Sequence, residues 1–120
     1  MMKNIFLMIG ALLLTAVSGC LPLEWNDGVL IDVRSPQEFQ EGALKGAINI
    51  PHTMIGEKIE AVVPDKSTRI FLYCRSGRRV ESAMKVLKAK KYTALCNLGG
   101  IEEARQELRL PVVKAPAGKR

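Results

Sequence analysis

The sequence is poor in residues that several classes of protein require. Aromatic side chains make up only 5% of the 120 residues, and no basic stripe is interleaved with them, which argues against a nucleic-acid-binding protein. Three cysteines are too few for a disulfide framework or a four-cysteine zinc site. No repeat or low-complexity segment occurs. The remaining class is one globular domain with an aliphatic core, consistent with 48% hydrophobic and 25% charged residues.

Acidic residues are outnumbered by basic ones. Lys and Arg total 18 and Asp and Glu total 12, so the formal net charge is +6. Such a surplus attracts anionic small molecules or a negatively charged membrane surface. The charge therefore favours an anionic ligand or an anionic surface as the partner.

The first 20 residues resemble a bacterial export signal. Residues 5–17 form an apolar run of about 13 residues, which fits the core of a signal peptide and is shorter than the ~20 residues that span a bilayer. Residues 17–20 (Val-Ser-Gly-Cys) resemble a lipobox, in which small residues precede a cysteine that receives a lipid. We predict a signal peptide over residues 1–19, lipidation of Cys20 and a periplasmic protein anchored to a membrane. A plain signal peptide, giving a soluble periplasmic protein, and an uncleaved anchor are the alternatives.

After a linker at residues 20–28, strand and helix patterns alternate through a domain at residues 29–110, and a basic tail follows at residues 111–120. Ser35, Pro36 and Glu38 form a capping-box start for a short helix that ends near Gly42. Apolar β-branched runs predict strands, and 3.6-residue periodicity predicts helices. The expected strands are 29–33, 47–50, 69–73 and 94–98, the last broken by Gly99 and Gly100, and the later helices are 53–63, 80–90 and 101–110.

This alternation predicts an α/β fold, with a mostly parallel sheet covered by helices on both faces. In such sheets, ligands bind beyond the carboxyl ends of the strands. Cys74 directly follows the expected strand 69–73, so it lies at that edge.

The segment from Cys74 to Arg79 carries the clearest chemical signal. A thiol at the end of a strand is followed within five residues by a helix, so peptide N–H groups can surround it as an anion-binding nest. Gly77 permits a positive φ in such a loop. Arg75, Arg78 and Arg79 add positive charge, which favours the thiolate, the nucleophilic form. The alternative is a buried structural cysteine beside a solvated basic turn.

Two blocks of sequence resemble the single-domain rhodaneses, in particular the small exported phage-shock-protein-E type. The first is Ile31-Asp32-Val33-Arg34 with Glu38, Gly42 and the segment 46–51; the second is the Cys74 loop, supported by the segment 97–101. Together they cover nearly all of residues 29–108. One departure is Ala43, where many rhodaneses carry histidine, and it concerns packing rather than the nucleophile.

The resemblance implies a rhodanese-like fold and a thiosulfate sulfurtransferase. Cys74 would take the outer sulfur of an anionic donor such as thiosulfate, become a persulfide and pass the sulfur to a thiophilic acceptor such as cyanide. Arg75 and Arg78 would attract the donor, and Arg79 would shape the loop. The N–H groups of residues 75–79, which include Ser76 and Gly77, would hold the outer sulfur. No metal or organic cofactor is implied.

Several alternatives remain open. Phosphatases and arsenate reductases of related fold have one more residue in this loop, so the six-residue loop here makes them weaker candidates. A non-catalytic binding module or a thiol redox protein would also use the fold. Cys96 is interpreted as a small buried hydrophobe, with a resolving thiol for Cys74 as the alternative. Asp32 and Arg34 are expected to support the loops rather than bind substrate.

Overall fold

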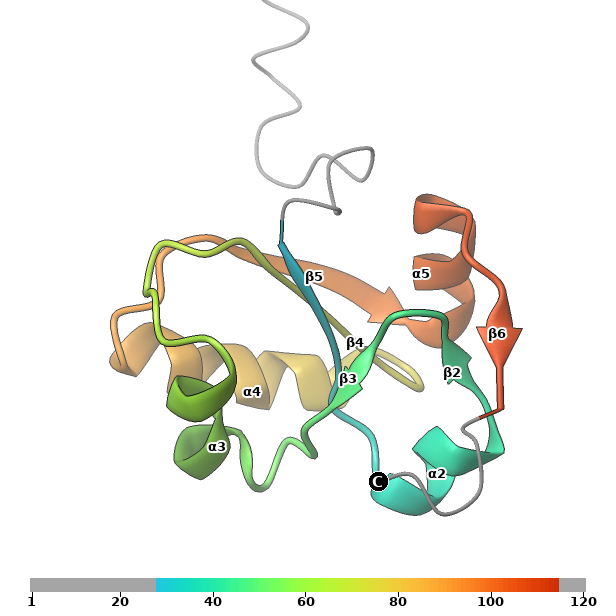
Figure 1. Cartoon of the computed structure of the whole chain (residues 1–120), viewed down its shortest axis with the longest axis horizontal. Helices are drawn as coiled ribbons and strands as arrows, with labels where there is room; N and C mark the ends of the chain where they lie inside the picture. Colours follow the sequence, from blue (N-terminus) through green and yellow to red (C-terminus); the bar gives the residue numbers. More distant parts are fainter. Residues whose placement is uncertain (1–27, 115–120) are drawn as a thin grey trace, which may run out of the picture.

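The computed structural model describes residues 28–114, and a four-stranded parallel sheet of order β3-β1-β4-β5 forms its centre (Figure 1). A separate antiparallel pair joins β2 to β6. The strands are β1 (Val29–Asp32), β2 (Ala43–Leu44), β3 (Ile48–Asn49), β4 (Ile70–Cys74), β5 (Leu95–Gly100) and β6 (Val112–Val113). The helices are α2 (Pro36–Glu41), α3 (Ile55–Val62), α4 (Arg78–Ala89) and α5 (Ile101–Leu108).

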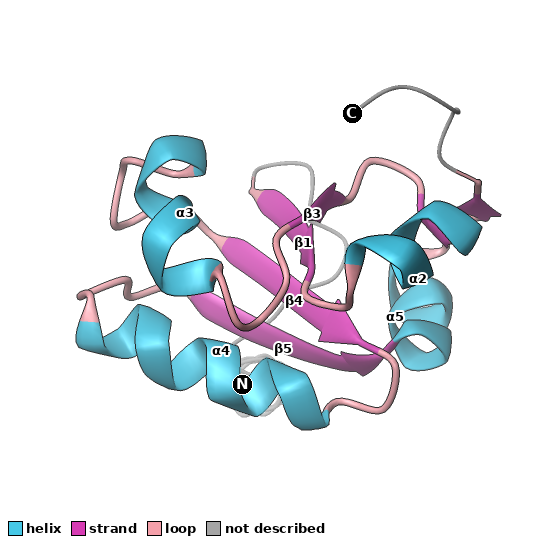
Figure 2. Ribbon diagram, turned by 90° about the horizontal axis from the view of Figure 1, so that it is seen from below, coloured by secondary structure: helices cyan, strands magenta, loops and turns pink. Residues whose placement is uncertain are grey.

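Helices cover both faces of the sheet, as the alternation of strands and helices predicts. Side chains of a strand alternate between its two faces, so each strand contributes to two apolar cores. Ile31, Leu72 and Cys74 face α3 and α4 in one core. Leu30, Phe71 and Tyr73 belong to the other core, which contains α5 and Leu44. Figure 2 shows α3 and α4 together, with α5 across the sheet from them.

The helix termini follow the local signals in the sequence. Ser35 and Glu38 form the predicted capping box of α2, and Gly42 follows its last residue. Val80, Ala83 and Leu87 are the buried positions of α4. This helix begins at Arg78 rather than near Val80, so two of the loop arginines belong to its first turn. Their N–H groups are therefore among the free donors of a helix N-terminus.

The prediction that Gly99 and Gly100 break the fourth strand is wrong, because β5 continues through Gly100. The register against β4 shifts between Leu72 and Cys74, where β5 contains one extra residue. Gly99 has a φ of 82°, a conformation that glycine adopts at little cost. The glycines therefore form a bulge and let β5 stay paired as far as the Cys74 loop.

The interpretation of residues from Pro111 onward as a loosely held tail is corrected in part. Val112 and Val113 form β6, which pairs with β2 through Leu44 and Ala43. Ala43, the position where the sequence departs from many rhodaneses, is buried in this pairing. The structure describes the first part of the tail, residues 111–114, and its strand β6 lies beside β2 (Figure 1).

The expected signal peptide, lipobox and Cys20 lie outside the described residues, as does most of the linker. Within residues 28–114, no helix is long and apolar enough to cross a membrane.

Candidate active site

The carboxyl ends of β1, β4 and β5 meet at one edge of the sheet, close to α2 and α5 (Figure 2). The chain passes from β1 to β3 on one side and later to β4 on the other side of β1. This reversal is the topological switch point at which open α/β sheets bind ligands. Cys74 is the last residue of β4 at this point, as the sequence predicts.

Cys74 is a free cysteine with no exposed surface, and a peptide group of the following loop donates to its sulfur. The N–H of Gly77 lies 2.8 Å from Cys74 Sγ. Gly77 has a φ of 98° and caps the N-terminus of α4. Since this left-handed conformation turns the loop back over the sulfur, the predicted need for glycine at this position is confirmed.

Glycines of β5 allow the loop to pack closely against the end of the sheet. A Cβ on Gly100 would lie 2.5 Å from the carbonyl oxygen of Arg75, and one on Gly77 would lie 3.3 Å from Gly99 Cα. Side chains at these positions would push the loop away from β5. The segment 97–101 therefore packs directly against the Cys74 loop.

The three loop arginines have different surroundings. Arg79 donates from both terminal nitrogens to Glu38, at 2.9 and 3.2 Å. Arg75 is 77% exposed and lies 3.8 Å from the same carboxylate. Arg78 is exposed and, among the described residues, makes no ion pair. Arg75 and Arg78 are thus the exposed loop cations available to a ligand, whereas both terminal nitrogens of Arg79 are bound to Glu38.

Glu38 is a residue beside the site that the sequence analysis places in the capping box and in the first rhodanese-like block, without a role at the site. Its carboxylate accepts from the N–H and hydroxyl of Ser35, both at 3.1 Å, besides the two bonds from Arg79. The hydrogen bonds from Arg79, aided by those from Ser35, lower the pKa of Glu38 to about 2. The carboxylate is therefore charged at neutral pH. The sequence signal was its place in the first rhodanese-like block, 41 residues before Arg79.

Asp32 and Arg34 form a buried pair at the end of β1, consistent with a supporting role. Arg34 Nη2 lies 2.6 Å from Asp32 Oδ2 and 2.6 Å from the carbonyl oxygen of Gly42. The amide of Asn49 donates to the carbonyls of both residues. Burial, followed by the charge of Asp32, raises the pKa of Tyr73 far above its ordinary value, so that phenol stays neutral. Together these contacts tie α2, β2 and β3 to the site.

Beside the loop lies a surface depression of about 490 Å³. Ser76, Gly77 and Arg78 form one side of it, Glu81 lies one turn further along α4, and Asn97 and Gly99 come from β5. Ser76 is exposed, as a ligand-binding loop residue should be. The loop thus presents polar groups to solvent at this depression.

The interpretation of Cys96 as a small buried side chain is confirmed. Cys96 is 3% exposed, and Cys74 is a free cysteine, so the two are not joined to each other. They also belong to different cores on opposite faces of the sheet. Cys96 pairs in register with Phe71, three residues or roughly 10 Å along β4 from Cys74. This separation exceeds the reach of a disulfide and argues against Cys96 as a resolving thiol.

Comparisons with known proteins converge on one family. The rhodanese-like domain model matches residues 21–107. The thiosulfate sulfurtransferase PspE of Escherichia coli (strain K12) is 38% identical over 84 residues, which cover 70% of this chain and 77% of that protein. A sulfurtransferase of Allochromatium vinosum is 33% identical over 93 residues, covering 78% and 84%. A solved rhodanese with anions from E. coli matches with a TM-score of 0.66 at 36% identity, over 73% of this chain and 99% of that one.

Proposed function

The chain belongs to the rhodanese-like family, and from this premise we propose that it is a thiosulfate sulfurtransferase that works through a persulfide on Cys74. The support comes from relatives named as sulfurtransferases and from one observation in the structure. That observation is the free Cys74, whose sulfur accepts a hydrogen bond from Gly77 N–H at 2.8 Å.

The proposed reaction consists of two displacements at sulfur. The Cys74 thiolate attacks the outer sulfur of thiosulfate, an S–S bond forms, and sulfite leaves with the electron pair of the bond that breaks. An acceptor such as cyanide then attacks the outer sulfur of the persulfide, and thiocyanate leaves as the thiolate is restored. Dividing one transfer into two steps is the usual advantage of a covalent intermediate.

The loop supplies what both steps need. N–H groups of residues 75–79 would hold the outer sulfur of the persulfide, whose negative charge a helix N-terminus favours. Arg75 and Arg78 are exposed and would attract the dianionic donor. Arg79 is bound to Glu38 and would shape the loop instead. Asp32 and Arg34, which bond to each other, would act only by supporting the edge of the sheet.

The other functions have less support. A redox cycle between Cys74 and Cys96 is opposed by their positions on opposite faces of the sheet. A phosphatase or arsenate reductase needs a larger loop than the six residues from Cys74 to Arg79. A binding module without catalysis would not require a free cysteine hydrogen-bonded to its loop.

We also propose that the protein acts after export, as the signal-like residues 1–19 indicate, and that Cys20 carries a lipid. Labelled palmitate supplied to expressing cells should enter the wild-type protein and not the Cys20→Ala variant. Equal labelling of the two proteins, or labelling of neither, would refute the lipid anchor.

The test of the reaction is the intact mass of the purified protein before and after excess thiosulfate. The wild type should gain the mass of one sulfur atom and lose it on addition of cyanide, with thiocyanate appearing in equal amount. Cys74→Ser should gain nothing while keeping the circular dichroism spectrum of the wild type. Thiocyanate formation that survives in Cys74→Ser would contradict the assignment. Release of arsenite or phosphate from the matching substrates would favour the alternative chemistry.

A further inference from the structure

Glu38 joins two segments that are far apart in the sequence. It lies in the first turn of α2, where its carboxylate accepts from Ser35 and completes a capping box. The same carboxylate accepts two hydrogen bonds from Arg79 in the first turn of α4. A helix cap requires only the first set of contacts, so the second set needs another explanation.

The pair with Arg79 is well shielded for a surface ion pair. The Glu38 and Arg79 side chains are 22% and 30% exposed, compared with 77% for Arg75. Two parallel N–H···O bonds fix the plane of the guanidinium as well as its distance. Arg79 is therefore held in one orientation, which a single contact to a lysine would not achieve.

Arg79 in turn is close to the nucleophile. The hydrogen bonds to Glu38 raise the pKa of Arg79, and the charge of the Cys74 sulfur adds to this effect. Arg79 lies in the turn of α4 that Gly77 caps, and Gly77 donates to Cys74 Sγ. The guanidinium thus belongs to the turn whose cap residue, Gly77, donates to the sulfur.

We propose that Glu38 is a positioning residue for sulfur transfer. By binding Arg79, it holds the first turn of α4 and the N–H of Gly77 against Cys74. It also keeps Arg79 away from the donor, so that the exposed Arg75 and Arg78 are the cations that meet an anionic substrate. This inference rests on the proposed function, because the step it supports is the displacement at the Cys74 sulfur.

The test compares Glu38→Gln with Glu41→Gln. Both variants remove one carboxylate charge from α2, but Glu41 is exposed and lies at the far end of the helix. Glu38→Gln should lower kcat for thiosulfate by roughly 10-fold, the order of loss expected when a reacting group is misplaced. The KM for thiosulfate should stay constant or fall, since a negative charge near a dianion is removed. Glu41→Gln should keep both constants.

A double-mutant cycle adds a second variant. Arg79→Lys keeps the charge but loses the bidentate geometry, so its kcat should fall as in Glu38→Gln. The double variant should be no slower than Arg79→Lys alone, because the two residues act as a unit. A wild-type kcat in Glu38→Gln, a rise in KM at constant kcat, or additive losses would each overturn the proposal.

Alkylation of Cys74 by iodoacetamide separates this inference from the proposed function. The rate should be higher in Glu38→Gln than in the wild type, since a loosened loop exposes the buried sulfur, and unchanged in Glu41→Gln. If the wild type takes no sulfur from thiosulfate, the proposed function fails, and the alkylation rates alone then test whether Glu38 positions the loop. Equal rates in all three proteins would then overturn the positioning role. Thermal melts confirm that each variant is folded at the assay temperature.

Discussion

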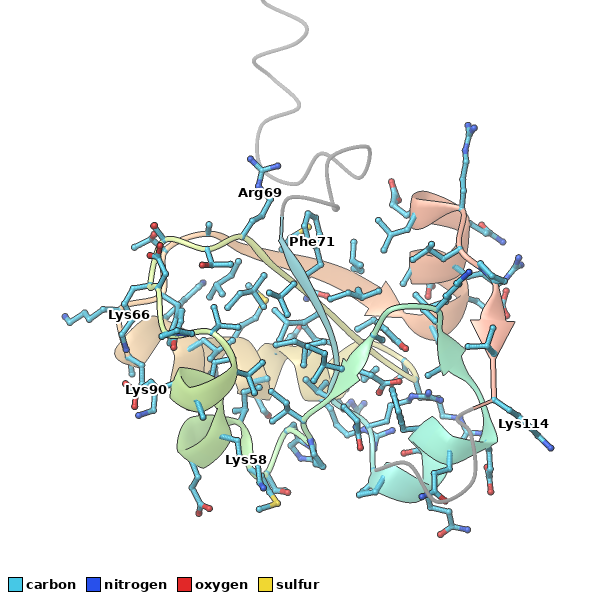
Figure 3. All side chains as sticks on the ribbon, in the orientation of Figure 1. Lys58, Lys66, Arg69, Phe71, Lys90 and Lys114 are labelled. Atoms are coloured by element: carbon cyan, nitrogen blue, oxygen red, sulfur yellow. The ribbon has the colours of Figure 1, made fainter. Side chains whose placement is uncertain are left out.

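The two ends of the parallel sheet are built from similar parts, yet only one holds Cys74, the proposed nucleophile. At the carboxyl end, Arg79 binds Glu38 beside the Cys74 loop. At the amino end, Lys66 binds Glu60 at 2.8 Å, donates to the carbonyl of Lys90 at 3.0 Å and lies 4.4 Å from the ring centre of Tyr92. Figure 3 shows Lys66 and Lys90 together, on the side of the molecule away from Lys114.

The direction of α4 explains the difference. Its N-terminus lies at the Cys74 end, where free N–H groups and the positive end of the helix dipole favour an anion. Its C-terminus lies at the other end, where free carbonyls favour a cation, and Lys66 occupies that position. The Glu38–Arg79 pair thus differs from the Glu60–Lys66 pair in lying at the N-terminus of α4, next to Gly77 and Cys74.

The two ends also contain a matched pair of glycines, which gives the prediction with the largest effect. A Cβ at Gly100 would strike the carbonyl oxygen of Arg75 in the loop, and one at Gly28 would strike that of Arg69 before β4. Each alanine variant should destabilise the fold by about 1–3 kcal/mol, since backbone must move. Only Gly100→Ala should also lower kcat, by roughly 10- to 100-fold, because the loop shifts.

Urea unfolding and sulfur-transfer assays of the folded proteins measure these two effects separately. If Gly28→Ala lowered kcat as much as Gly100→Ala does, the division of the sheet into a structural and a functional end would be wrong.

Two buried tyrosines, one at each end of the sheet, provide a second comparison, with a smaller expected effect on stability. Tyr73, beside Cys74, accepts from the N–H of Leu44 at 2.9 Å, and Tyr92, at the amino end, donates to the carbonyl of Val63 at 2.5 Å. Tyr73→Phe leaves a buried N–H unpaired and should cost about 2 kcal/mol, whereas Tyr92→Phe should cost about 1 kcal/mol. Urea unfolding checks the order of the two values. The reverse order would show that Leu44 finds another acceptor.

The sequence predicts the parts of this molecule that depend on neighbouring residues. The capping box at Ser35, the apolar face of α4 and the position of Cys74 after a buried strand all follow from local patterns. The need for glycine at position 77 also follows, since a tight loop requires a positive φ. These features determine the layered fold and the position of Cys74, the proposed nucleophile.

Contacts between distant segments were not predictable in the same way. The strands β2 and β6 contain two residues each, too few for any periodic pattern, and they pair across about 70 residues of chain. From the sequence alone, the bulge at Gly99 cannot be told from a strand break, because a bulge is defined by its pairing with the neighbouring strand β4. The capping box already explains a glutamate at position 38, so the sequence gives no separate sign of its bond to Arg79, 41 residues away.

The smallest predicted effect is the loss of stability at acid pH, which should differ between variants of Glu38 and of Glu60. The pKa of Glu38 falls from an ordinary 4.5 to about 2 on folding, so its stabilising effect is complete above about pH 4.5 and is lost as the pH falls towards 2. We expect wild-type protein to exceed Glu38→Gln in stability by on the order of 1 kcal/mol at neutral pH, after allowing for solvent screening. The difference should vanish near pH 2.

Glu60 provides the control at the amino end of the sheet. The hydrogen bond from Lys66 lowers its pKa too, but its side chain is 54% exposed, and water and salt screen the pair. Glu60→Gln should therefore follow the wild-type dependence of unfolding free energy on pH, as measured with urea from neutral pH to about pH 2. A curve for Glu38→Gln that runs parallel to the wild type would contradict the bond to Arg79. If the pH dependence of Glu60→Gln differed from the wild type as much as that of Glu38→Gln does, the ion pairs at the two ends would be equivalent. The orientation of α4 would then be what distinguishes the two ends.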